Sequence, residues 1–332
     1  MKILIVKLSS LGDVVHTLPA VMDIQTAFPQ AQIDWVVERS FAPLVQRCAA
    51  VHRVIACDLR QWRKRPFSAE THQAWRAFKT DLQREAYDAV IDLQGLTKSA
   101  WMSWLARTTS QGKRFAMANR TMGSGYEPPT RWVADVAIAV EPHIHALVRS
   151  RVVCAQALGY SFGAEVRYGL VAQDRPPSSI PTQKPCVVLV HGTSRADKEW
   201  PLQSWLTLGK RLNDLGYQVA LPHGNAQELQ RSQEIAASLR NAVVWPSLSL
   251  DELTHHMASC QGVIGVDSGL SHIAVALDLP HVQIYNFDTA WRTGPVGLTR
   301  QVFVFHPPAP TLEAVWQAWQ KVSASCVFSI AC

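Results

Sequence analysis

Short apolar runs alternate with amphipathic stretches along almost the whole sequence, and this alternation limits the possible folds more than any other feature. The predicted strands are KILIV (2–6), IDWVV (33–37), VHRVIA (51–56), YDAVIDL (87–93), CVVLVHG (186–192), YQVALPHG (217–224), AVVWP (242–246), GVIGVDSG (262–269) and HVQIYN (281–286). Apolar strands separated by helical patterns are typical of parallel sheets that are buried on both faces. We therefore predict an α/β fold in which helices cover parallel sheets.

The alternation is interrupted by AQDRPPSSIPTQKP, a stretch rich in proline and serine at residues 172–185. Such a composition is typical of a linker. The chain of 332 residues is also longer than a single hydrophobic core usually supports. We predict two Rossmann-like domains, 1–171 and 186–309, whose switch points face a common cleft.

The composition indicates a soluble or peripheral protein with an anionic partner. The formal net charge is +6, which attracts anions without the charge density of a DNA-binding arm. The seven cysteines are odd in number and include no CxxC pair, so we expect no disulfide framework or zinc site, and a reducing cytoplasm fits. Lys7 and Asp13 interrupt the first apolar run, unlike a signal peptide. No apolar stretch approaches the ~20 residues that span a bilayer.

In the second half, LVHGTSRADKEWP (189–201) ends a predicted strand and leads into a helix. Thr193 and Ser194 can offer backbone and hydroxyl donors and Lys198 a positive charge, which together suit a phosphate. An ordinary strand–helix loop explains the same residues equally well. Glu228 follows the next strand, where an acidic residue often binds ribose hydroxyls, although a helix-surface glutamate is the simpler interpretation.

A second such loop, GVDSGLSHIAVAL (265–277), also ends a strand of the second half. Asp267 and Ser268 can cap the following helix, Gly269 permits close backbone approach, and His272 lies near the first turn. Alone, this is a capped helix with a satisfied histidine. Two such loops in one Rossmann-like half favour a diphosphate site. Neither loop matches GxGxxG or GxxxxGK[ST], which argues against a redox dinucleotide or a P-loop NTPase.

In the first half, LRQWRKRPF (59–67) gathers Arg60, Arg63 and Lys64 around a tryptophan. So many cations in so few positions favour an anionic ligand: phosphates, carboxylates or a lipid surface. The alternative is a solvated basic surface. Weaker signals of the same kind are Arg120 and the group His145, Arg149 and Arg151.

The first strand is followed by KLSSLGD, which places a lysine and a carboxylate at the end of the sheet where ligands gather. Asp13 can act as a helix N-cap or as a general base facing the cleft. Gly12 allows a tight turn, and Lys7, Ser9 and Ser10 can hold anionic or hydroxyl groups of an acceptor. The residues alone leave both interpretations open.

Four motifs together resemble glycosyltransferase family 9, the family of the lipopolysaccharide heptosyltransferases. They are KxSSxGDxxHTLPA at the N-terminus, the WRK cluster, HxTxRxDKxWP and VDSGLSH. Their spacing matches over nearly the whole chain. The resemblance implies a GT-B fold, in which two Rossmann-like domains face each other across a cleft. It also implies that a C-terminal helix within 310–332 packs back on the first domain.

The resemblance further implies an activity and its partners. Members of this family are inverting, metal-independent glycosyltransferases without a cofactor. The implied reaction transfers L-glycero-D-manno-heptose from ADP-L-glycero-beta-D-manno-heptose onto the inner Kdo of Kdo2-lipid A, in the inner core of Gram-negative lipopolysaccharide. We accordingly expect a peripheral protein at the inner-membrane surface, on its cytoplasmic side, and no nucleic-acid partner.

Site residues follow from the resemblance position by position. Asp13 matches the family's proposed general base, and Lys198 matches the lysine that neutralises the leaving diphosphate. Donor contacts fall on Thr193, Ser194, Lys198, Glu228, Leu248, Asp267, Ser268, Gly269 and His272. Acceptor contacts fall on Lys7, Ser9, Ser10, Gly12, Arg60, Arg63, Lys64 and Arg120.

One departure from the family keeps alternatives open. Many members have a YGPTDP-like loop after the last strand of the second half, where this chain has YNFDTAWRTGP (285–295). This loop borders the sugar site, so a heptosyltransferase II-like enzyme or one with a different donor sugar is an alternative. A basic module that binds anionic lipid or nucleic acid is a second alternative, but it leaves both strand-end loops of the second half without a role.

Overall fold

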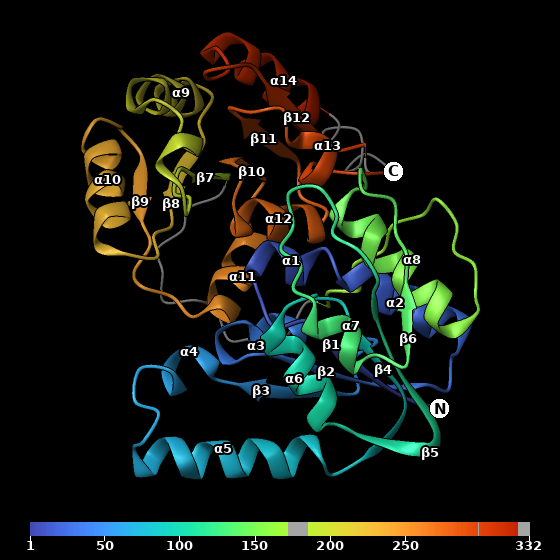
Figure 1. Cartoon of the computed structure of the whole chain (residues 1–332). Helices are drawn as coiled ribbons and strands as arrows, with labels where there is room; N and C mark the ends of the chain where they lie inside the picture. The colour runs from blue at the N-terminus through green and yellow to red at the C-terminus, as the bar shows by residue number, and fades with distance from the viewer. Residues whose placement is uncertain (172–184, 298, 325–332) are drawn as a thin grey trace. The chain divides into compact units, whose positions relative to one another are not determined.

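The computed structural model describes residues 1–171, 185–297 and 299–324. Contacts divide the chain into two compact units, Met1–Val171 and Ala172–Cys332. Of the predicted linker 172–185, only Pro185 belongs to the described residues, and the tail 325–332 lies outside them. Each unit is built around one parallel sheet with its own core (Figure 1).

The first unit holds a six-stranded sheet with the order β3-β2-β1-β4-β5-β6. The order reverses between β1 and β4, which pair in parallel, and the carboxyl ends of neighbouring strands on either side of such a reversal form a ligand site in α/β proteins. One face of the sheet packs against α4, α5 and α6, whose Trp62, Phe78 and Met102 are buried in a shared core. Helices α2 and α8 pack on each other, and α8 also contacts β4, β5 and β6.

The elements of the first unit have these bounds: β1 Lys2–Val6, α1 Leu11–Val15, α2 Leu18–Ala27, β2 Gln32–Glu38, α3 Ala42–Val45, β3 Arg53–Cys57, α4 Leu59–Trp62, α5 Ala69–Leu82, β4 Ala86–Asp92, α6 Thr97–Leu105, β5 Arg107–Met117, α7 Pro129–Val133, β6 Val136–Ile138 and α8 Ala146–Leu158. Short 3-10 turn η1 covers Arg39–Phe41.

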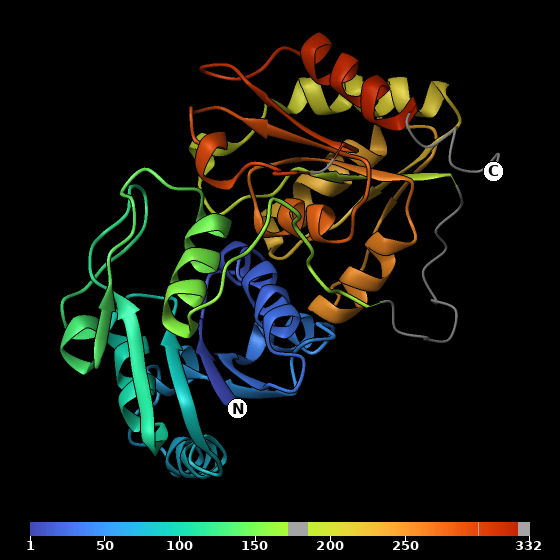
Figure 2. The ribbon, with the colours of Figure 1, turned by 90° about the vertical axis from the view of Figure 1, so that its right-hand side faces the viewer.

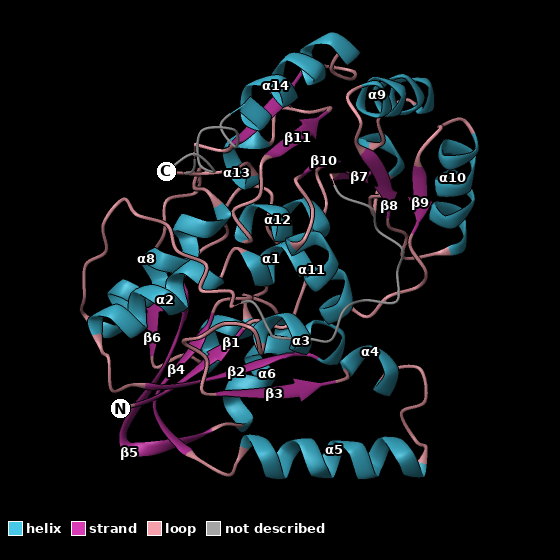
Figure 3. Cartoon of the chain, turned by 180° about the vertical axis from the view of Figure 1, so that it is seen from behind, coloured by secondary structure: helices cyan, strands magenta, loops and turns pink. Residues whose placement is uncertain are grey.

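The second unit repeats the plan with the order β12-β11-β10-β7-β8-β9, which reverses between β7 and β10. Its strands β7, β10 and β11 are buried along their whole length, as expected for parallel strands covered on both faces. Helices α9 and α14 lie on one face and α11 and α12 on the other (Figure 2). Seen from behind, α9 and α10 flank β8 and β9 (Figure 3).

The elements of the second unit have these bounds: β7 Cys186–Val190, η2 Ala196–Lys198, α9 Leu202–Asp214, β8 Gln218–Leu221, α10 Ala226–Ala237, β9 Ala242–Val244, α11 Leu250–Ala258, β10 Gly262–Val266, α12 Gly269–Ala276, β11 His281–Tyr285, α13 Ala290–Thr293, β12 Gln301–Phe305 and α14 Leu312–Ala324.

The C-terminal helix α14 packs into the core of the second unit. Its buried side chains Val315, Trp319 and Val322 belong to the core of the second unit, together with α9 and the strands. Trp200 on the same core donates its indole N–H to the Pro310 carbonyl just before the helix. Helix α14 therefore belongs to the second unit. The expectation that a helix within 310–332 also packs on the first unit stays a prediction.

Three strands are missing from the sequence-based prediction. β5 is long but largely polar and half-exposed, and its pairing with β4 contains a register irregularity. β6 has three residues. β12 lies at the edge of its sheet, where side chains need not be apolar on both sides.

Membrane-spanning helices, groups of possible metal ligands and cysteine thiols can each be looked for among the described residues. In that part of the chain, no helix is long and apolar enough to cross a membrane. Among the same residues, no three His, Cys, Asp or Glu side chains are grouped so that they could hold a metal ion. In the same part of the chain, Cys48, Cys57, Cys154 and Cys260 are free, buried thiols.

Candidate active site

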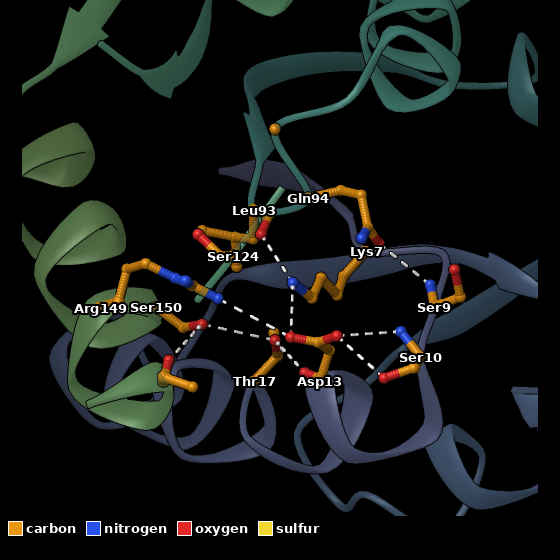
Figure 4. A network of polar contacts seen from close by, with 12 residues as sticks. Lys7, Ser9, Ser10, Asp13, Thr17, Leu93, Gln94, Ser124, Arg149 and Ser150 are labelled. Atoms are coloured by element: carbon orange, nitrogen blue, oxygen red, sulfur yellow. Dashed lines mark hydrogen bonds and ion pairs between the residues drawn. The ribbon is translucent and has the colours of Figure 1, made fainter. Parts of the chain in front are cut away.

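Asp13 lies in the short helix α1 that follows β1, and Lys7, Ser10 and Arg149 point toward its carboxylate (Figure 4). It occupies the first turn of α1, whose N-cap is Ser10. One carboxylate oxygen accepts the Ser10 backbone N–H at 3.1 Å and the Ser10 hydroxyl at 2.9 Å. The carboxylate is about 35% exposed. The N-cap is thus Ser10 and not Asp13, which stands three residues later and accepts the N-cap N–H. This carboxylate still remains open to a ligand.

Two buried cations face the other oxygen of Asp13. The Lys7 ammonium lies 3.5 Å away and the Arg149 guanidinium 3.7 Å away. Burial alone would raise the pKa of Asp13, but Lys7, the Ser10 N–H and Arg149 outweigh burial and hold the pKa below its usual range. Burial in turn lowers the pKa of Lys7. Asp13 is therefore ionised at neutral pH.

The loop after β4 fixes the other side of this network. Lys7 donates to the Leu93 carbonyl at 2.9 Å. The Gln94 side-chain oxygen accepts the backbone N–H groups of Leu8 and Ser9. The loop is itself anchored by buried Asp92, which accepts the N–H groups of Gln94 and Gly95 and the Ser99 hydroxyl. Burial raises the pKa of Asp92 to about 6.

The sequence singled out Arg149 only as a weak basic signal, and it gave no role to Lys98 or Gln94. Arg149, from α8, donates to the Thr121 hydroxyl at 2.7 Å as well as facing Asp13. Lys98, from α6, donates to the Ser9 hydroxyl at 2.8 Å. Gln94 lies in the β4 loop. Their distance from Asp13 along the chain hides them, although the strand-end position of Gln94 is a signal that topology could have supplied.

The predicted acceptor residues divide into two groups. Lys7, Ser9, Ser10 and Gly12 lie around Asp13 in the loop and first turn after β1. The cations Arg60, Arg63 and Lys64 are exposed on α4 and the turn that follows it. Arg120 is exposed, and its guanidinium donates to the Ser124 carbonyl. No direct contact joins these four cations to Asp13 among the described residues.

In the second unit, the loops after β7 and β10 meet at the switch point, as predicted. Lys198 lies 2.5 Å from one Asp267 oxygen and His272 lies 3.5 Å from the other. The Thr193 hydroxyl donates to the Asp267 carbonyl at 3.2 Å. Asp267 is buried, which would raise its pKa, but His272 and Lys198 hold the pKa well below its usual range. Lys198 keeps further N–H donors for a ligand anion.

Helix α12 begins beside this group, at Gly269, with Ser268 as its N-cap. The Ser268 hydroxyl caps no backbone N–H and has no hydrogen-bond partner among the described residues. The first N–H groups of a helix carry partial positive charge and lack partners within the helix. Together with Lys198, this end of α12 has the chemistry of a diphosphate site.

Glu228 follows β8, the neighbour of β7, and borders a small cavity of about 50 Å³. Its carboxylate accepts the Gly224 N–H at 2.7 Å. A Cβ atom at Gly192 would come 2.6 Å from the Glu228 carboxyl carbon, so any larger residue there would displace the Glu228 carboxylate. The residues lining the cavity are His191, Gly192, Thr193, Glu199, Asn225, Gln227, Glu228 and Arg231.

Asn286, at the end of β11, holds the Lys198 turn in place. Its amide donates to the carbonyls of Asp197 and Glu199 at 3.0 and 2.9 Å, on either side of the lysine. Two predicted donor residues lie farther from this network: Ser194 is exposed after Thr193, and Leu248 is half-buried in the loop between β9 and α11.

The two sites differ in what they can do chemically. The first presents an ionised, accessible carboxylate flanked by buried cations, which suits proton removal from a hydroxyl next to an anionic group. The second presents a lysine, a helix N-terminus and a nearby glutamate, which suits a diphosphate joined to a ribose.

Comparison with known proteins places this chain among enzymes. The family model for glycosyltransferase family 9 (heptosyltransferase) matches residues 75–317. Lipopolysaccharide heptosyltransferase 1 of Pseudomonas aeruginosa is 38% identical over 307 residues, which cover 90% of this chain and 82% of that protein. Lipopolysaccharide heptosyltransferase 1 of Escherichia coli K12 is 39% identical over 287 residues, covering 86% and 88%.

Solved structures agree with these relatives. The E. coli heptosyltransferase WaaC with ADP superposes with a TM-score of 0.86 at 35% identity, covering 97% of this chain and 100% of that one. The same enzyme with ADP-2-deoxy-2-fluoro heptose gives a TM-score of 0.80 at 36% identity, covering 96% and 98%. The likeness confirms the predicted α/β fold of the GT-B class. The chain is a glycosyltransferase and belongs to glycosyltransferase family 9.

Proposed function

We propose that this chain transfers L-glycero-D-manno-heptose from ADP-heptose onto the inner Kdo of Kdo2-lipid A, with inversion and without a metal ion. This chain is 38–39% identical, over 86–90% of its length, to lipopolysaccharide heptosyltransferase 1 of two bacteria. This identity is the observation that carries the proposal. A relative's structure with ADP-2-deoxy-2-fluoro heptose supports the donor class.

In the proposed reaction Asp13 is the general base. The proton of the attacking Kdo hydroxyl passes to Asp13 as its oxygen forms a bond to the anomeric carbon of the heptose. The bond from that carbon to the β-phosphate oxygen breaks, and ADP leaves with the electron pair. A positioned base contributes ~10²–10⁴-fold to such a step.

The leaving group defines the role of the second site. ADP gains negative charge as it departs, and charge that develops in the transition state is best stabilised by donors already in position. Lys198 and the N-terminus of α12, beginning at Gly269, supply such donors. Thr193 and Ser268 add hydroxyl groups, and Glu228 suits the ribose hydroxyls.

The acceptor explains why Asp13 is surrounded by cations. Two cations make Asp13 a weak base, because they stabilise its ionised form. Kdo carries a carboxylate of its own, which can pair with Lys7 and Arg149 when it binds. Sharing these cations weakens their hold on Asp13 and raises its pKa at the moment when it must accept a proton.

The acceptor also suggests where the protein works. Kdo2-lipid A is an anionic amphiphile, so the exposed cations Arg60, Arg63 and Lys64 suit its charged groups. We propose that the protein acts as a peripheral enzyme at the cytoplasmic side of the inner membrane. Lower affinity for vesicles that contain Kdo2-lipid A after charge reversal of Arg63 and Lys64 would support this assignment.

The direct test is heptose transfer to Kdo2-lipid A, followed by mass spectrometry. Asp13→Asn keeps the shape of the side chain but removes its basicity, so turnover is expected to fall ~10²-fold or more, while ADP-heptose still binds. Near-normal turnover of Asp13→Asn would reject Asp13 as the base. Comparing ADP-heptose with ADP-mannose and UDP-sugars tests the donor, and preference for another sugar would replace heptose in the proposal.

A further inference from the structure

An aromatic surface of the first unit is exposed without a role in the site. Trp104 and Trp132 are 62% and 77% exposed, Trp101 is 43% exposed, and Phe67 is 90% exposed. Single exposed apolar residues are common on proteins, but several large aromatic rings on adjoining elements mark an interaction surface.

These rings are carried by neighbouring elements. Trp101 and Trp104 lie one helical turn apart on α6 and therefore point to the same side. Trp101 stacks on Trp75 of α5, with ring centroids 4.6 Å apart, and α7, which carries Trp132, packs beside α6. Phe67 lies in the turn between α4 and α5. The buried sides of α4, α5 and α6 share one core, so their exposed sides face away from the sheet.

The same elements are strongly basic. Between residues 59 and 82, which span α4 and α5, there are six cations and two acidic residues, Glu70 and Asp81. Among these cations, Arg63, Lys64 and Arg65 are exposed just before Phe67, and Arg76 and Lys79 are exposed on α5. We call these five cations, with Phe67, Trp101, Trp104 and Trp132, the basic–aromatic face.

We propose that the basic–aromatic face is the membrane-contact surface, and that its partner is a bilayer containing anionic lipid. Tryptophan prefers the boundary between headgroups and acyl chains, where its ring is apolar and its N–H is wet. Lysine and arginine beside it are attracted to anionic headgroups. This inference rests on the proposed function, which requires an acceptor held in a membrane.

The position of α4 links the face to the acceptor residues. Arg60 on α4 lies close enough to Glu38, at the end of β2, to lower the pKa of that buried carboxyl against the effect of burial, which raises it overall. The same short helix leads directly to Arg63 and Lys64. A lipid-linked acceptor can therefore keep its acyl chains in the bilayer while its sugars reach the strand ends of the first unit.

The test measures binding of the full-length chain to vesicles of phosphatidylcholine with or without phosphatidylglycerol. Wild type is expected to bind the anionic vesicles and to be released by salt. Trp104→Ser/Trp132→Ser is expected to bind about tenfold more weakly, since two rings leave the interface. Arg76→Glu/Lys79→Glu is expected to lose about fivefold or more for each cation.

Two control variants make comparable ring and charge changes in the second unit, away from the basic–aromatic face. Phe303→Ser removes a ring that is 51% exposed on the edge strand β12, and Lys210→Glu/Arg240→Glu reverses two exposed cations of the second unit. Both controls are expected to bind vesicles like wild type. Equal binding by the Trp104→Ser/Trp132→Ser variant and wild type, or equal loss in the controls, would overturn the proposal.

Activity separates this inference from the proposed function. Turnover on acceptor embedded in vesicles is expected to fall in the Trp104→Ser/Trp132→Ser variant, while turnover on a deacylated acceptor in solution stays as in wild type. If wild type transfers heptose to neither acceptor, the proposed function fails. The vesicle-binding measurements still test whether the basic–aromatic face contacts the membrane. If wild type self-associates through this face and the variant is monomeric with unchanged vesicle binding, the face joins two copies and the membrane assignment is wrong.

Discussion

Replacing Asp92 with asparagine should change how the stability of the first unit depends on pH. Asp92 is buried beneath the site and accepts three hydrogen bonds, two from backbone N–H groups and one from Ser99. Burial nevertheless dominates and raises its pKa from 3.8 to about 6. The folded protein therefore binds this proton more tightly than the unfolded chain does.

The sign and the size follow from that pKa. A raised pKa stabilises the folded state at low pH, and this contribution is complete below about pH 4 and lost as the pH rises through about 6. Each unit of pKa is worth about 1.36 kcal/mol, so the shift corresponds to about 3 kcal/mol. Asparagine does not titrate. The unfolding free energy of Asp92→Asn minus that of wild type should thus increase by about 2.4 kcal/mol between pH 4 and pH 7, most of the full shift.

Urea unfolding of both proteins across this pH range, followed by fluorescence and circular dichroism, measures the difference. Other titrating groups are common to both proteins and largely cancel. Ser99→Ala removes a hydrogen-bond donor to the Asp92 carboxylate, so the pKa of Asp92 should rise. The pH at which this variant loses stability should therefore be higher than in wild type. ADP binding checks that the second unit stays native. A free-energy difference that stays flat with pH would refute the reasoning that burial controls Asp92.

Three further predictions concern the second unit. Lys198→Met should lower kcat about 10²–10³-fold, as the loss of one transition-state donor does. It also leaves the buried Asp267 carboxylate without its lysine partner. A normal kcat would show that Lys198 has no role in the mechanism. Gly192→Ala pushes a Cβ against Glu228, so KM for the donor should rise about tenfold or more with kcat little changed, measured by steady-state kinetics. Asn286→Ala frees the two carbonyls that flank Lys198. Its kcat should fall about tenfold while the far-UV circular dichroism spectrum stays unchanged. An unchanged kcat would show that the Lys198 turn keeps its conformation without Asn286.

Much of the fold was predictable because burial on both faces leaves a strong local signal. The central strands of each sheet, such as β1 and β10, are apolar throughout and were placed within a few residues. The strands missed lie toward the sheet edges, where β5 and β12 alternate with polar residues. The apolar face of α14 was predictable, but the core that receives Val315 and Trp319 was not, since an amphipathic pattern specifies a face and not its partner.

The sequence by itself determined the alternation, the strand-end loops and the residue types they carry, because these depend on local periodicity and on short motifs such as SSLGD and VDSGLSH. Only the tertiary structure decided which charges meet. Arg149 reaches Asp13 from α8, and Asn286 holds the Lys198 turn from β11. Parallel sheets bring distant strand ends together. The pKa values of Asp13, Asp92 and Asp267 therefore follow from burial and partners that no local pattern contains.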